Sequence, residues 1–122
     1  MMEGTFRPDY RPVIRVTVWW NDKVQDIVAL IDTGFSGELK VSPSVSSELG
    51  LVVTHTQGVL LGNDTGIETP AALVYILMEG TMEEVSVLIT PGTGAIGTGL
   101  LKRFGYKLIV DFKNSKVQLE KC

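Results

Sequence analysis

The sequence predicts an all-β protein with one or two short helices. Apolar and polar residues alternate over 13–20, which is typical of a strand that buries one face. The turn residues Asn21 and Asp22 separate this segment from a second apolar segment over 23–31. Most of the remaining apolar runs also predict strands, so helices are a minor part of the expected fold.

Each further element is predicted by its apolar run and by the residues that bound it. Ser42 as N-cap, Pro43 at the first helical position and Gly50 as stop predict a helix of about two turns. Two apolar runs on either side of 62–66 predict a hairpin, whose turn is rich in glycine and small polar residues. The remaining prediction is of strands over 84–90, 106–112 and 116–120, with at most a short helix over 100–104.

Length and composition indicate one globular domain over residues 1–122. The chain is 44% hydrophobic and 20% charged, and its formal net charge of −3 argues against nucleic acid as a partner. The single cysteine, Cys122, excludes an intrachain disulfide and is compatible with a reducing cytoplasm. The N-terminus lacks the apolar stretch of a signal peptide, and no apolar run approaches the length of a membrane span. We therefore expect a soluble, cytoplasmic protein that binds neither nucleic acid nor membrane.

Two glycine-flanked motifs compete as the functional site. The segment Gly92–Gly97 has the spacing G-x-G-x-x-G of a dinucleotide-binding turn, and a predicted strand precedes it. However, only about five residues separate Gly99 from Gly105, whereas a crossover between parallel strands needs a dozen or more. The interpretation that these glycines serve a tight loop is therefore preferred to nucleotide binding.

The other motif is Asp32-Thr33-Gly34, which follows an apolar strand and precedes a glycine-containing turn. A lone carboxylate behind an apolar run is costly unless something pairs with it. One interpretation is structural, in which Asp32 caps its own turn. The other is catalytic and requires a second carboxylate.

Residues 29–51 and 95–120 together resemble the retropepsin-like aspartic proteases, in particular their small prokaryotic single-domain branch (clan AA). The resemblance implies a closed barrel or sandwich that acts as a homodimer, with the hairpin between the two segments in the place of the flap. It implies that Asp32 is catalytic, that the Thr33 hydroxyl locks two active-site loops together, and that Gly34 offers its backbone to the substrate.

The same resemblance implies roles for three further groups of residues. Phe35, where retroviral members usually carry a small residue, would shape the wall of the substrate pocket. The flap turn over residues 61–66 differs from the glycine-rich turn of retroviral members. Ala95, Ile96 and Gly97 would form the loop beneath the active-site turn, followed by a short helix with Leu100 and Leu101. The flap tip would comprise Leu61, Gly62, Asn63, Asp64, Thr65 and Gly66.

The chemistry of this family needs two carboxylates that share one proton, one acting as general base on a water. A second Asp-Thr-Gly occurs at 64–66, but no apolar strand precedes it, and Asp64 there is interpreted as a solvated turn residue. The partner of Asp32 is therefore expected to be Asp32 of a second chain, related by a two-fold axis.

The expected activity is hydrolysis of peptide bonds in a peptide or protein substrate, without a cofactor. No metal site is expected, because the lone His55 has no neighbouring cysteine or second histidine. The alternative is a homodimer of the same fold that has lost proteolysis and serves as a peptide-binding or scaffold module.

Overall fold

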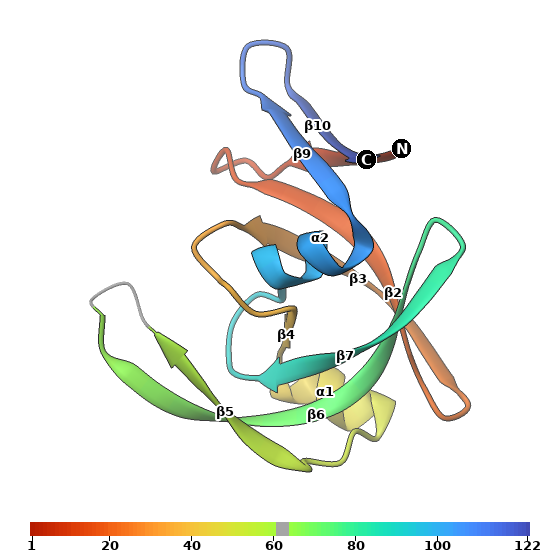
Figure 1. Ribbon diagram of the computed structural model, residues 1–122, viewed down its shortest axis with the longest axis vertical. Coiled ribbons are helices and arrows are strands. Elements are labelled where there is room, and N and C mark those ends of the chain that lie inside the picture. Colours follow the sequence, from red (N-terminus) through yellow and green to blue (C-terminus); the bar gives the residue numbers. More distant parts are fainter. Residues whose placement is uncertain (61–63) are drawn as a thin grey trace.

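The computed structural model of the protein describes residues 1–60 and 64–122, which contain ten strands and two helices (Figure 1). In chain order these elements are β1 (Met2–Phe6), β2 (Pro12–Trp20), β3 (Lys23–Asp32), β4 (Leu39–Val41), α1 (Pro43–Leu49), β5 (His55–Leu60), β6 (Gly66–Met78), β7 (Thr81–Ile89), β8 (Ala95–Gly97), α2 (Thr98–Phe104), β9 (Tyr106–Asp111) and β10 (Lys116–Lys121).

Six of the strands close into a barrel. Neighbouring strands follow the order β6-β7-β4-β8-β3-β2, and an additional pairing of β2 with β6 joins the two ends of this series. The pairings β3–β8 and β4–β7 are parallel, whereas the others in the barrel are antiparallel. Closure leaves these strands no free edge within the ring.

The barrel is filled by apolar side chains that alternate along the strands. Branched aliphatic residues supply most of this core, which is typical of a small barrel whose interior is packed rather than open. Among the described residues, neither helix has the length and apolar character that crossing a bilayer requires. The most deeply buried core side chains include Ile14, Val16, Val18, Leu39, Val41, Val74, Ile76, Val87, Ile96 and Leu100.

Two extensions project from the barrel in different directions (Figure 1). On one side, β5 pairs with the first half of β6 and forms a long hairpin with it. On the other side, β1, β10 and β9 form a three-stranded arm that contains both termini. Gly4 lies where β1 passes closely over β2, since a Cβ atom there would lie 2.2 Å from the Val13 carbonyl oxygen.

The predicted fold class is confirmed, as are the bounds of most elements. Helix α1 has Ser42 as N-cap, whose hydroxyl accepts from the Val45 N–H, and it ends at Gly50 in the left-handed conformation. The turn at Asn21 and the strands on either side of it also occur as predicted. Three strands were not predicted from local pattern, namely β1, β4 and β8.

Glu79, in the β6–β7 turn, ties the barrel to the terminal arm. Its carboxylate accepts a hydrogen bond from the buried Tyr106 hydroxyl at 2.8 Å and pairs with the Met1 ammonium. These donors hold the pKa of Glu79 below its usual value, and the ammonium makes the larger contribution. Burial, followed by the hydrogen bond to Glu79, raises the pKa of Tyr106, so its hydroxyl remains a donor at neutral pH.

Replacing Tyr106 by phenylalanine should lower the free energy of unfolding, and the loss should depend on pH. Because the folded-state pKa of Glu79 is depressed, its stabilisation is present above the unfolded-state pKa and is lost as the pH falls through the folded-state value. The urea midpoints of wild type and Tyr106→Phe should therefore differ most at about pH 7 and converge towards about pH 3. Tyr10→Phe, which removes the same hydroxyl from an exposed side chain, is the control. A pH-independent difference would contradict this account.

Candidate active site

Asp32 ends strand β3 at the place where the barrel strand gives way to a turn. Ile31 before it is buried, Asp32 is half-buried, and Thr33 and Gly34 after it are exposed. The apolar run therefore packs the strand into the core, and the Asp32 carboxylate lies at the rim of the barrel.

The turn itself holds the carboxylate in one orientation. The backbone N–H of Gly34 donates to Asp32 Oδ1 at 2.9 Å, and the N–H of Phe35 donates to the Asp32 carbonyl oxygen at 3.1 Å. A Cβ atom on Gly34 would lie 3.3 Å from the same Oδ1, tighter than most such contacts. A residue without a side chain thus lets backbone approach the carboxylate closely, and a charge-assisted hydrogen bond results.

The segment Ala95–Gly97 lies directly beside the end of β3. Strand β8 pairs in parallel with it, in the register Leu30 with Ala95, Ile31 with Ile96, and Asp32 with Gly97. The structure therefore brings together the Asp32 turn and the later apolar-apolar-glycine segment, which lie more than sixty positions apart in the sequence.

Hydrogen bonds hold the turn after Asp32 against the residues at the start of α2. The N–H and the hydroxyl of Thr98 both donate to the Phe35 carbonyl oxygen, at 2.9 and 3.3 Å. The N–H of Gly97 donates to the Glu38 carbonyl oxygen, and that of Gly99 to the Gly37 carbonyl oxygen, each at 3.1 Å. Such a close approach leaves no room for side chains at Gly97 or Gly99.

Phe35 connects the turn to the β5–β6 hairpin. Its side chain is 4% exposed and belongs to a small apolar cluster with Ala71 and Leu88, against which Val59 of β5 packs. The Lys40 ammonium lies 4.4 Å from the centroid of its ring, a cation–π distance. The expected role of Phe35 in the wall of a substrate pocket stays a prediction.

A polar network that sequence reasoning missed surrounds Glu38. Its carboxylate forms an ion pair with Arg103 of α2 and accepts from the Ser86 N–H at 3.3 Å. The ion pair raises the pKa of Arg103. The Ser86 hydroxyl in turn donates to Gln57 of β5 at 2.9 Å and lies 3.2 Å from His55 Nε2. No local pattern signals this network, because its members come from β5, β7, α2 and the loop before β4.

The β5–β6 hairpin occurs where it was predicted, with Leu60 opposite Gly66. Asp64, Thr65 and Gly66 are exposed at this end of the hairpin, and Asp64 has the positive φ of 63° that turn residues tolerate. The other three predicted flap-tip residues, Leu61, Gly62 and Asn63, lie outside the described residues.

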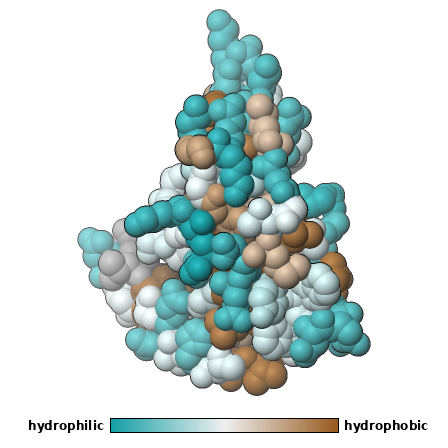
Figure 2. All heavy atoms as spheres, turned by 45° about the vertical axis from the view of Figure 1, so that its right-hand side comes forward, coloured by the Kyte–Doolittle hydropathy of each residue, from teal (hydrophilic) through white to brown (hydrophobic). Residues whose placement is uncertain are grey.

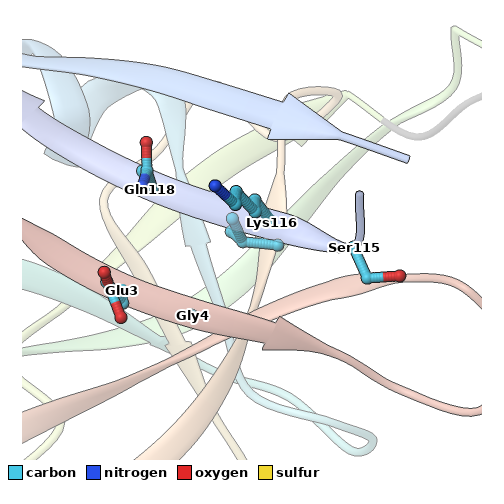
Figure 3. Close-up of a pocket in the computed structure, with 6 residues that line it drawn as sticks. Glu3, Gly4, Ser115, Lys116 and Gln118 are labelled. Carbon is cyan, nitrogen blue, oxygen red and sulfur yellow. The ribbon is translucent and has the colours of Figure 1, made fainter. Parts of the chain in front are cut away.

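A separate cavity lies away from the Asp32 turn. The one in Figure 3 has a volume of about 170 Å³ and lies on the terminal arm, where Glu3 of β1 and Lys116 and Gln118 of β10 line it. It is formed by elements other than the Asp32 turn and β8. Among the residues that the structure describes, no three His, Cys, Asp or Glu side chains gather closely enough to hold a metal ion.

The architecture is that of a known class of protein. A crystal structure of a retropepsin-like aspartic protease from Rickettsia conorii superposes on the chain with a TM-score of 0.68. The match covers 98% of this chain and 89% of that chain, at 15% sequence identity. No protein-family model and no curated protein matches the sequence. The chain therefore has a retropepsin-like fold, which the sequence resemblance had predicted.

Proposed function

We propose that the protein is an aspartic endopeptidase that acts as a homodimer, each subunit a single domain of residues 1–122. The observation that carries the proposal is the Asp32 turn. Within a retropepsin-like fold, the chain presents an Asp-Thr-Gly at a strand end, with the carboxylate fixed by the Gly34 N–H at 2.9 Å. A carboxylate held at the rim of the barrel, rather than in its core, suits chemistry on an external substrate.

Two Asp32 carboxylates, one from each subunit, supply the reacting groups. Like charges a few ångströms apart do not both ionise readily, so the pair holds one proton. The ionised member takes a proton from a water, which attacks the scissile carbonyl carbon. The protonated member donates a hydrogen bond to the carbonyl oxygen as the tetrahedral intermediate forms. One chain carries half of this pair, and a two-fold axis beside the turn completes it.

The remaining predicted residues take supporting roles in this proposal. Thr33 links the two active-site turns, Gly34 presents backbone to the substrate, and Ala95, Ile96 and Gly97 support the turn from below. The β5–β6 hairpin, whose described end carries Asp64, Thr65 and Gly66, closes over the substrate as a flap. Phe35 beneath it couples the flap to the turn. The free and exposed Cys122 suits a reducing cytoplasm.

Binding of a peptide-like inhibitor should protect the flap from hydrogen exchange. Without ligand, the amides of 57–60 and 64–72 should exchange faster than those of β3, because a lid must open to admit substrate. With the aspartic-protease inhibitor pepstatin bound, protection should rise there and change little in the β9–β10 hairpin. Equal protection of the hairpin and β3 in the free protein would contradict the flap assignment.

Peptide cleavage tests the proposal directly. Purified protein is incubated with a diverse peptide library at several pH values, and the products are identified by mass spectrometry. Cleavage by wild type that is absent from Asp32→Asn supports the peptidase. Peptide binding by wild type without cleavage at any pH would instead identify the binding or scaffold module.

A further inference from the structure

A second concave surface lies where the end of β2 meets β6 and β7, on elements other than the Asp32 turn. Its volume of about 410 Å³ falls within the range of small-ligand sites, roughly 300–1,000 Å³. Figure 2 brings the right-hand side of Figure 1 forward and shows hydrophobic residues exposed among hydrophilic ones. We call this surface the tryptophan groove, lined by Trp19, Trp20, Asn21, Tyr75, Met82 and Glu84.

The register of the sheet places three of these side chains in one row. Trp19 pairs with Tyr75, and Tyr75 pairs with Glu84, so the three project from the same face of adjacent strands. Trp19 is 40% exposed and Tyr75 is 38% exposed, although both are large aromatic residues. The Trp19 indole is held in place because its Nε1 donates to the Asn21 carbonyl oxygen at 2.6 Å. A fixed aromatic surface therefore ends at a carboxylate.

Two polar groups at the groove have no partner among the described residues. Glu84 is exposed and forms no ion pair with any of them. The indole Nε1 of Trp20 is buried and makes no hydrogen bond. The Trp20 ring packs against the barrel core, so its Nε1 is closed to a ligand, and Glu84 is the polar group that the groove offers.

We propose that the tryptophan groove binds an arginine side chain of a partner polypeptide. A planar guanidinium stacks on indole and phenol rings and also pairs with a carboxylate, which is the combination that Trp19, Tyr75 and Glu84 offer. A purely apolar occupant would cover Glu84 without pairing its charge, which is unfavourable. The site is independent of the proposed peptidase activity.

Nuclear magnetic resonance tests this directly, because the only two tryptophans of the chain line the groove. ¹⁵N-labelled protein is titrated with a blocked Gly-Arg-Gly tripeptide, and the two indole cross-peaks are followed. We expect the Trp19 cross-peak to shift saturably at millimolar peptide. The same tripeptide with citrulline, a neutral isostere of arginine, should bind about tenfold more weakly because it lacks the charge.

Glu84→Gln should weaken the arginine peptide about fivefold, whereas the matched variant Glu83→Gln should leave its affinity unchanged. Glu83 lies on the same strand but faces the other side, where it acts on Arg103. Equal binding of the citrulline peptide, or absence of any indole shift, would overturn the proposal. Indole shifts that appear on concentrating the protein alone would show that a second copy of the chain occupies the groove, which also overturns it.

Discussion

Replacing Asp32 by asparagine should lower the rate of peptide hydrolysis by about a thousandfold or more. The substitution removes the general base and the shared proton while keeping the size of the side chain. The fold should survive, because the Gly34 N–H that now donates to Asp32 Oδ1 can donate to an amide oxygen instead. Unchanged cleavage by Asp32→Asn would end the aspartic-protease interpretation.

Mixing wild type with Asp32→Asn separates a shared site from two independent sites. If each active site needs one Asp32 from each subunit, a mixed dimer is inactive. After subunit exchange at equal concentrations, random pairing leaves about a quarter of the dimers fully wild type, so activity per total protein falls to about a quarter. If each subunit had its own independent site, about half of the activity per total protein would remain.

The pH–rate profile should be bell-shaped and lie on the acidic side. The active form carries one proton on the pair of carboxylates. At lower pH both carboxyls are protonated and the general base is lost, whereas at higher pH both are ionised and the proton donor is lost. A rate measured from about pH 3 to pH 8 should therefore rise and then fall. A rate that increases monotonically to neutral pH would contradict the shared-proton mechanism.

Asp32→Asn should also leave the dimer intact or tighten it, since the substitution removes like charges that face each other across the two-fold axis. Sedimentation equilibrium at micromolar concentration measures this. A weakened dimer would indicate that Asp32 stabilises the structure. Full peptidase activity from a protein that is monomeric at this concentration would contradict the two-chain site.

The second large effect is expected at Gly97. A Cβ atom there would lie 2.3 Å from the Gly37 carbonyl oxygen and 2.5 Å from that of Phe35, both of which are backbone atoms. The backbone of Gly97 has φ −109° and ψ 178°, which alanine also adopts, so any loss arises from the collision alone. Gly97→Ala should lower the free energy of unfolding by about 3 kcal/mol or more.

Urea unfolding measures this loss, with Gly66→Ala as the matched control. No atom of the residues that the structure describes lies within 4 Å of a Cβ atom on Gly66, so alanine there should change stability by less than about 0.5 kcal/mol. Because the collision also pushes the turn after Asp32 away from β8, peptidase activity should fall in Gly97→Ala at temperatures where the protein is still folded. Equal stability of the two variants would contradict the close approach of the two loops.

Local sequence determined the elements whose signals are short-range. Ser42, Pro43 and Gly50 bound α1 because capping and left-handed termination act within a few residues. The alternation over 13–20 identified the buried face of β2 and set Trp19 and Trp20 on opposite faces. The apolar run into Asp32 placed that carboxylate at a strand end, and the Asp-Thr-Gly that follows carried the resemblance that predicted the fold.

The tertiary structure decided the rest, since its stabilising contacts join residues far apart in the chain. Strands β4 and β8 have three residues each, too few to show a period, and they form only because the barrel supplies their partners. Glu38 and Arg103 stand 65 positions apart, so no local pattern pairs them. The same holds for the row of Trp19, Tyr75 and Glu84, which exists because barrel closure brings β2 against β6. Barrel closure buries apolar surface contributed by all six strands, and the sequence of one strand does not show which other strand it will pair with.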